Sequence, residues 1–175
     1  MSEKKILNVG CGNQTYGTHR IDVYKSETTT EVGDLNKKFP YKDNFFDEVY
    51  ANCVLEHLKN LDNFESECFR VLKKGGKLYV HTDNAGYLPF HIFKTHEHNA
   101  FLKTQYPNGV GYGHAQNDDA HYHLFVASHL QKLFKRFKNQ KIHYDYGGRS
   151  KFHRFLLKLL PKHMGAIGIG IEAIK

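Results

Sequence analysis

The stretch Ile6-Leu7-Asn8-Val9-Gly10-Cys11-Gly12 decides the fold, because it is an apolar run that stops at a Gly-x-Gly turn. Glycine at both turn positions lets the backbone bend sharply and lets a ligand approach the main chain. Asp22 follows in Arg20-Ile21-Asp22-Val23, where an acidic side chain at the end of a second strand can bind a ribose diol. The pattern predicts a nucleotide-binding turn, and the alternative is an ordinary turn that ends a strand.

Further segments follow in the order that a cofactor-binding α/β sheet requires. With them the chain resembles a class I S-adenosylmethionine-dependent methyltransferase, in particular the small type 11 members, over roughly residues 5 to 83. Besides the glycine turn, the motifs that carry the resemblance are Asp34-Leu35-Asn36, Phe39-Pro40, Phe46-Asp47, Val54-Leu55-Glu56-His57 and the run from Leu72 to Gly76. Their order is specific, whereas each motif alone is not.

A nicotinamide or flavin dehydrogenase is the rival interpretation of such a turn. Its Gly-x-Gly-x-x-Gly pattern would need a third glycine where this chain has Thr15. Asp22 also follows Gly12 after about half of the roughly twenty residues usual in that pattern. The sequence therefore favours the methyltransferase interpretation.

Apolar periodicity predicts the remaining elements. Strands are expected over residues 5–9, 19–23, 30–32, 48–51 and 77–81, with a closing pair over 142–146 and 166–174. Helices are expected over residues 61–72, 128–137 and 152–160. Gly75 is expected to close the first as a left-handed cap, and Ser128 to be the N-cap of the second. We expect one methyltransferase domain over residues 1–175, with residues 84–123 inserted as a lid. Its fold class is α/β, with a Rossmann-like open, mostly parallel sheet and a C-terminal antiparallel strand.

The connections between the first three predicted strands are short. Only residues 11–18 link the first strand to the second, whereas a parallel crossover normally needs a dozen or more. The flanking helices on that side are therefore expected to be truncated. The C-terminal helix, or a second subunit in a homodimer, would then cover that flank of the sheet.

Length and composition fit one domain without a membrane span. The chain has 175 residues, of which 40% are hydrophobic, and no apolar run approaches the eighteen or so residues of a spanning helix. The first residues lack the apolar core of a signal peptide, so a cytoplasmic location is expected. Cys11, Cys53 and Cys68 form no metal-ligand spacing and are expected to be free thiols.

Positive charge is concentrated at the C-terminus. Of 25 Lys and Arg residues, 11 lie in residues 132–175 beside only Asp145 and Glu172, leaving 14 basic and 16 acidic residues elsewhere. This basic lobe would face nucleic acid, an acidic acceptor or an anionic membrane, or it would be a solvated face. Its aromatic residues have a helical spacing that suits a core better than a base-stacking platform: Phe134, Phe137, Phe152 and Phe155.

The resemblance implies S-adenosylmethionine as cofactor, S-adenosylhomocysteine as product, and a set of binding residues. The turn of Gly10, Cys11 and Gly12 would pass beside the methionine portion of the cofactor. Asp22 would accept hydrogen bonds from both ribose hydroxyls, and Asp34 would meet the adenine amino group beside the Leu35 backbone. Asn52 would line the methyl donor. Asn8 stands where the family often has an acidic residue, and its amide can orient water or the cofactor ammonium without charge. As alternatives, Asp34 is a turn or N-cap residue and Asn52 caps a strand end.

The acceptor side is less well defined by the sequence. Residues 84–123 form the sizeable insertion and hold many Tyr and His residues, a composition that suits a loop closing over substrate. A neutral histidine is the natural general base near neutral pH, and the candidates are His57, His81 and His121. His81, which with Asp83 ends the fifth strand, ranks slightly above the others, and helix packing or capping is the stronger interpretation of His57. The alternating histidines of this segment lack a carboxylate or cysteine partner at fixed spacing, so no metal site is expected.

Three classes of function remain open from the sequence. The first is methyl transfer to a small-molecule or glycan acceptor by direct in-line displacement. The second is an RNA methyltransferase that uses the basic lobe, although Asn52 is followed by Cys53-Val54-Leu55 and not by the Pro-Pro-aromatic signature of amino-group nucleic-acid enzymes. The third is a non-catalytic cofactor-binding protein.

Overall fold

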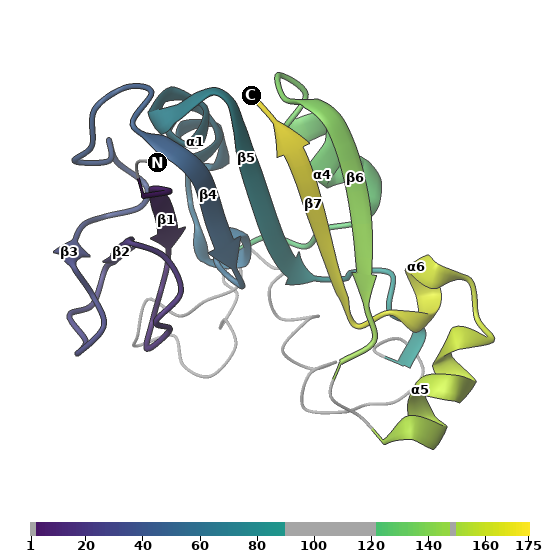
Figure 1. The fold of residues 1–175 in the computed structure, drawn as a ribbon. Helices are drawn as coiled ribbons and strands as arrows, with labels where there is room; N and C mark the ends of the chain where they lie inside the picture. Colours follow the sequence, from purple (N-terminus) through teal and green to yellow (C-terminus); the bar gives the residue numbers. More distant parts are fainter. Residues whose placement is uncertain (1–2, 90–121, 148–149) are drawn as a thin grey trace.

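The computed structural model describes residues 3–89, 122–147 and 150–175, and places seven strands in one sheet of order β3-β2-β1-β4-β5-β7-β6 (Figure 1). The strands are β1 (Ile6–Val9), β2 (His19–Asp22), β3 (Glu31–Val32), β4 (Phe46–Asn52), β5 (Leu72–Asp83), β6 (Lys138–Asp145) and β7 (Gly168–Ile174). The helices are η1 (Leu55–His57), α1 (Leu61–Val71), α4 (Ala127–Leu133), α5 (Lys151–Lys158) and α6 (Lys162–Gly165).

The strand directions confirm the predicted fold class. β1 pairs in parallel with β2 and β4, and the pairs β2–β3 and β4–β5 are also parallel. β7 runs antiparallel between β5 and β6. The sheet is therefore open and mostly parallel, with a C-terminal antiparallel strand, and the carboxyl ends of its parallel strands meet at one edge.

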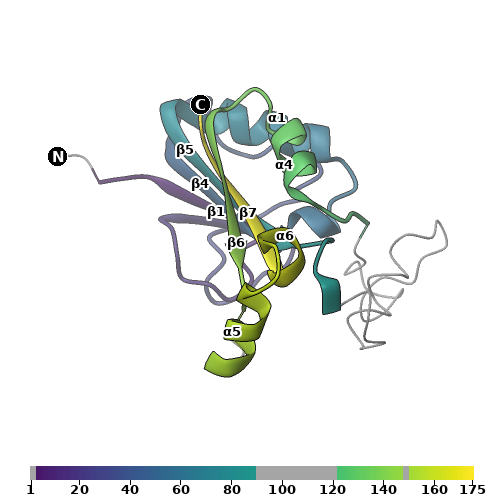
Figure 2. The ribbon, with the colours of Figure 1, turned by 90° about the vertical axis from the view of Figure 1, so that its right-hand side faces the viewer.

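The hydrophobic core lies on one face of this sheet. Val49 and Ala51 of β4 alternate with partly exposed residues, and both are fully buried. α1 and α4 cover that face, where Phe64 and Leu130 join the core and α1 contacts β5 while α4 contacts β7. Figure 2 shows both helices on the same side of the strands. The alternation follows from the period-2 geometry of a strand with one buried face.

The opposite face carries no helix across β1 and β4 within the described residues. Tyr50 of β4 and Tyr79 of β5 stack there with ring centroids 5.1 Å apart, and Tyr16 meets Tyr50 edge-on at 4.9 Å. Hydrogen bonds replace a helix in the link after β2, where Gly12 O accepts from the Ser26 hydroxyl at 2.8 Å and the Thr28 hydroxyl at 3.0 Å. The predicted truncation of the flanking helices is confirmed.

Several predicted helix boundaries are wrong, and α4 ends at Leu133 rather than at the predicted residue 137. α1 ends at Val71, and Leu72 is already extended because it pairs with Phe46 of β4. Gly75 does have a positive φ of +78°, but it lies inside β5, where its N–H donates to Lys175 O at 3.0 Å. α4 begins at Ala127, so Ser128 lies inside the helix and is not the N-cap.

α5 differs most from the expectation. It does not cover the bare flank of the sheet and lies beyond the edge where the parallel strands end (Figure 1). Leu157 packs it against Tyr87. Phe134 and Phe137 are buried as predicted. The core placement of Phe152 and Phe155 is wrong, because they are 71% and 61% exposed. Helical spacing identifies an apolar face but not what that face meets.

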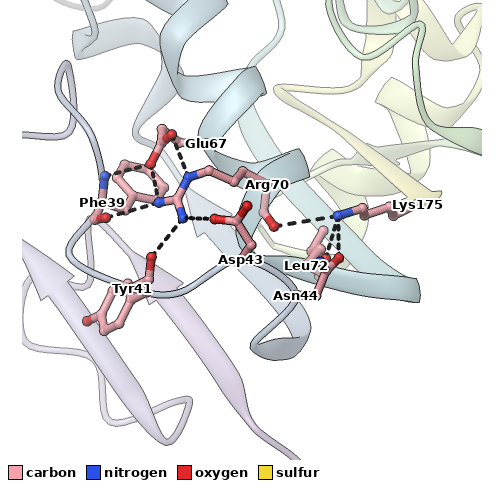
Figure 3. A network of polar contacts seen from close by, with 8 residues as sticks. All are labelled: Phe39, Tyr41, Asp43, Asn44, Glu67, Arg70, Leu72 and Lys175. Carbon is pink, nitrogen blue, oxygen red and sulfur yellow. Dashed lines mark hydrogen bonds and ion pairs between the residues drawn. The ribbon is translucent and has the colours of Figure 1, made fainter.

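A buried charge network joins α1 to the link before β4 (Figure 3). Arg70 donates to both oxygens of Glu67, at 2.8 Å and 2.6 Å, and to the main-chain oxygens of Tyr41 and Phe39 at 2.8 Å and 3.0 Å. Arg70 also bonds Asp43 at 2.6 Å, and Glu67 accepts the Phe39 N–H at 2.7 Å. These contacts satisfy the polar main chain of a link that has no secondary structure of its own.

Candidate functional site

The turn after β1 brings the main chain close to the β4 side of the sheet. Gly10 has a φ of +67°, and its N–H donates to Ile21 O at 2.8 Å. A Cβ at this position would lie 2.3 Å from Val54 Cγ2, so no side chain fits. The sequence prediction of a sharp glycine turn with close approach of the main chain is therefore supported at Gly10.

Asp22, at the end of β2, has a fixed carboxylate. Its Oδ2 accepts the Gly12 N–H at 2.8 Å, and its Oδ1 accepts the Tyr24 N–H at 3.0 Å. A carboxylate has about four lone-pair sites, so each oxygen can accept one further hydrogen bond. The side chain is thus oriented by the main chain and still able to bind a pair of hydroxyl groups.

Asp34 lies in the turn after β3. Its Oδ1 accepts the Asn36 N–H at 2.9 Å, and Lys37 Nζ lies 3.3 Å from its Oδ2. These contacts lower the pKa of Asp34, chiefly through the Asn36 N–H, so the group stays ionised at neutral pH. Asn36 in turn accepts the Lys59 N–H at 2.7 Å, which ties this turn to the segment before α1.

One cavity of ≈ 440 Å³ collects these groups at the carboxyl edge of β1, β2 and β4. This volume lies within the range usual for small-molecule sites. Four residues predicted to bind cofactor line it: Gly10, Asp22, Asp34 and Leu35. The sequence prediction missed other lining residues: Val23, Tyr24, Asn36, Cys53, Val54, Leu58, Lys59 and Tyr122.

Four other predicted cofactor residues are not among the described residues that line this cavity. Cys11 is buried, and Gly12 acts through its N–H to Asp22. The Asn8 amide is buried and donates to Gln14 Oε1 and Tyr16 O, both at 3.2 Å, so it shapes the first loop. Asn52 ends β4 next to the lining residue Cys53.

The three candidate general bases have different positions. His57 lines the cavity, on the turn η1. His81 lies in β5 outside the lining, with its Nε2 3.9 Å from Asp145 Oδ2, and burial lowers its pKa. His121 lies outside the described residues. Of the described candidates, His57 is the one that lines the cavity, whereas the sequence analysis ranked His81 slightly higher.

Glu56 is a buried acid that sequence reasoning did not single out, although it stands in the Glu-His pair of the family motif. It is 2% exposed, and its carboxylate accepts the Thr82 hydroxyl at 2.8 Å. Burial raises the pKa of Glu56 to about 7. Its main-chain oxygen accepts the Tyr122 N–H at 2.6 Å, which holds the end of the predicted lid at the cavity. Residues 90–121 of that lid lie outside the described residues.

Metal ligands and membrane spans were both tested in the described part of the chain. It contains no group of three or more His, Cys, Asp or Glu side chains placed to hold a metal ion. No helix there has the length and apolarity needed to cross a bilayer. The predicted cellular location is not tested by either observation.

Residues 9–80 match the family model described as methyltransferase domain. Over 116 residues, the chain is 44% identical to the ubiquinone biosynthesis O-methyltransferase, mitochondrial, of Rattus norvegicus, which covers 51% of this chain. The chain spans about a third (34%) of that relative's length.

Solved structures share the fold. A S-adenosylmethionine-dependent methyltransferase from Thermotoga maritima superposes with a TM-score of 0.68 at 17% identity, covering 100% of this chain and 84% of that one. A phosphoethanolamine N-methyltransferase from Haemonchus contortus, in complex with S-adenosyl-L-methionine, gives a TM-score of 0.64 at 15% identity, with 99% and 49% covered. At these identities the likeness concerns the fold.

Proposed function

We infer that this chain is a class I S-adenosylmethionine-dependent methyltransferase, which binds S-adenosylmethionine in the ≈ 440 Å³ cavity and methylates a small organic acceptor. The observation that carries the proposal is the convergence of Gly10, Asp22 and Asp34 on that cavity from the ends of three neighbouring strands. In open α/β sheets, ligands bind outside the carboxyl ends of the strands.

The lining fits the chemical parts of this cofactor. Asp22 has lone pairs free for the two ribose hydroxyls, and its orientation is fixed by two main-chain N–H groups. Asp34 stays ionised and can accept a hydrogen bond from the adenine amino group. The apolar side chains of Leu35 and Leu58 line the cavity beside it. The Gly10 turn leaves main chain facing the cavity for the methionine portion, with Asn8, Cys11 and Gly12 shaping that turn and Asn52 next to the lining.

The cofactor supplies an electrophilic methyl group on a positively charged sulfonium. The protein therefore has to position the acceptor in line and exclude water, and proximity provides most of the rate. For a hydroxyl acceptor, we assign proton removal to His57, because it lines the cavity. His81 and His121 are the remaining candidates.

We favour a small molecule as the methyl acceptor. The sequence also left a glycan unit open as an acceptor. The relative from Rattus norvegicus is named as an O-methyltransferase of ubiquinone biosynthesis, which supports a hydroxyl acceptor. Of the aromatic residues of the basic lobe, Phe134 and Phe137 are buried and cannot stack on bases, whereas Phe152 and Phe155 are exposed, so RNA is kept as the second acceptor class. Arg136 is also engaged, donating to both oxygens of Glu65 at 2.9 Å and 2.6 Å.

The test is transfer of labelled methyl from S-adenosylmethionine to a panel of phenols, amines, sugars and RNA. We expect product with a phenolic or other hydroxyl compound, and at least about a hundredfold loss of turnover in His57→Gln, because general base catalysis contributes that much or more. His143→Gln, on the exposed strand β6 away from the cavity, is the matched control. RNA as the preferred acceptor, or cofactor binding without transfer to any class, would contradict the proposal.

A further inference from the structure

α5 presents an apolar stripe to the surface. Phe152, Phe155 and Leu156 of α5, and Leu159 in the turn that follows it, recur at i, i+3, i+4 and i+7, so they lie on one side of this segment. They are 71%, 61%, 46% and 68% exposed. Leu157 faces the other way, is 6% exposed and packs with Tyr87, so the protein body holds the helix by its opposite side. The stripe is therefore not the side that anchors α5 to the fold.

The charge around this stripe has one sign. No acidic residue occurs between Asp145 and Glu172, whereas Arg149, Lys151, Arg154, Lys158 and Lys162 all fall there. Lys151, Arg154 and Lys158 belong to α5 itself, and Lys162 begins α6. Lys151 and Arg154 are exposed. The helix thus combines a large apolar face with an exclusively cationic flank.

We propose that α5 is an interfacial helix that docks this protein on an anionic lipid surface. Aromatic and aliphatic side chains in water gain free energy by entering the boundary between headgroups and acyl chains. Lysine and arginine beside them are attracted to anionic headgroups, and an acidic side chain would be repelled. Both properties of α5 are satisfied at once by an anionic bilayer, whereas a solvated lysine-rich face would need no apolar stripe.

The position of α5 gives this docking a direction. Figures 1 and 2 both place α5 beyond the edge at which the parallel strands end. The ≈ 440 Å³ cavity opens among loops at the same edge, lined by residues that follow β1, β2 and β4. A lipid surface bound by α5 would therefore lie on the cavity side of the sheet. The proposal stands on α5 alone and does not depend on the methyl acceptor.

The test is cosedimentation of the full chain with vesicles. We expect binding to vesicles of equimolar phosphatidylcholine and phosphatidylglycerol, little binding to phosphatidylcholine alone, and weaker binding as salt is raised. Phe155→Ser with Leu159→Ser should lower the partition coefficient at least about tenfold, because two large apolar side chains no longer insert. Lys151→Glu with Arg154→Glu should lower it by a similar factor and reduce the salt dependence.

Matched controls separate docking from general effects. Val32→Ser removes another exposed apolar side chain, on β3, and Lys38→Glu with Lys74→Glu makes the same change in net charge at exposed positions elsewhere. Both should bind vesicles like the wild type. The Phe155/Leu159 variant should keep the wild-type melting temperature, since its side chains are exposed.

Several results would overturn the proposal. One is no binding to anionic vesicles, and another is equal binding by the Phe155/Leu159 variant. A lower melting temperature of that variant would mean that the chain itself covers the stripe. A dimer in light scattering that this variant dissociates would assign the stripe to a second copy of the chain.

Discussion

Replacing Arg70 by methionine should destabilise the protein more than any surface charge change. The substitution keeps an apolar stem but removes the guanidinium that holds Glu67 and the link before β4 (Figure 3). The Arg70 and Glu67 side chains are only 19% and 10% exposed, so water replaces the lost partner incompletely. An uncompensated buried charge is the main cost of breaking such a pair.

The contacts give the magnitude. Loss of Arg70 leaves the Glu67 carboxylate with the Phe39 N–H, and leaves the main-chain oxygens of Phe39 and Tyr41 without this donor. Breaking a buried pair costs about 3–5 kcal/mol. The bond to Asp43, whose side chain is 68% exposed, adds little to this cost. With about 2–4 °C per kcal/mol for a chain of this size, the melting temperature should fall by about 6–20 °C.

The assay is urea unfolding at neutral pH, with Arg70→Met, Glu67→Gln and the double variant compared. The double variant should be more stable than Arg70→Met alone, because it no longer buries an unpaired carboxylate. Exposed Lys74→Met is the control and should stay within about 0.5 kcal/mol of the wild type. Arg70→Met within about 1 kcal/mol of the wild type would refute the reasoning.

The pH dependence gives a second readout of the same pair. Burial alone would raise the pKa of Glu67, but the bonds from Arg70 and the Phe39 N–H outweigh it and lower the pKa below the model-peptide value of 4.5. A carboxylate with a lowered folded pKa binds fewer protons when folded, so its contribution is full above that value. It is lost as pH falls through the folded pKa. The stability gap between wild type and Arg70→Met should therefore narrow in acid.

Two further predictions concern the site. Gly10→Ala should lower both the melting temperature and the cofactor affinity, because its Cβ would lie 2.3 Å from Val54. Gly12→Ala should lower the melting temperature less, because no atom lies within 4 Å of its Cβ, although its φ is +49°. Equal losses in thermal unfolding would contradict the packing argument. Because the pKa of Glu56 is raised to about 7, the folded protein holds this proton more tightly and stability should fall as pH rises from 4.5 through 7. Glu56→Gln should remove this loss of unfolding free energy, which is on the order of 3 kcal/mol in the wild type. If calorimetry gave the variant the same pH dependence of stability as the wild type, the burial argument would be contradicted.

The sequence predicted the sheet and the cofactor side because both depend on local signals in a fixed order. Asp22 is the last residue of β2 and Asp34 comes two residues after β3, so the parallel topology brings them to one cavity. Gly75 was misread because a glycine just after a helical pattern fits a helix cap, and the sequence does not show that Gly75 pairs inside a strand with a φ of +78°. The tertiary contacts of a side chain cannot be predicted from the residues next to it in the sequence.

The acceptor side shows the same limit. Tyr122 and Glu56 meet through a main-chain bond between segments far apart in the chain, which no periodicity reports. The stripe of α5 was visible as a helical pattern, but the pattern could not tell whether Phe152 and Phe155 face the core or the outside. Tertiary packing decides that, and it reversed the prediction.

Calorimetric titration of the chain with S-adenosylmethionine and S-adenosylhomocysteine tests the central claim most directly. We expect micromolar binding of both by the wild type. Asp22→Ala should bind at least about tenfold more weakly, because the carboxylate that would accept the ribose hydroxyls is lost. Asp62→Ala, at an exposed position of α1 outside the cavity, should bind like the wild type. No binding by the wild type, or equal binding by Asp22→Ala in a folded state, would contradict the account.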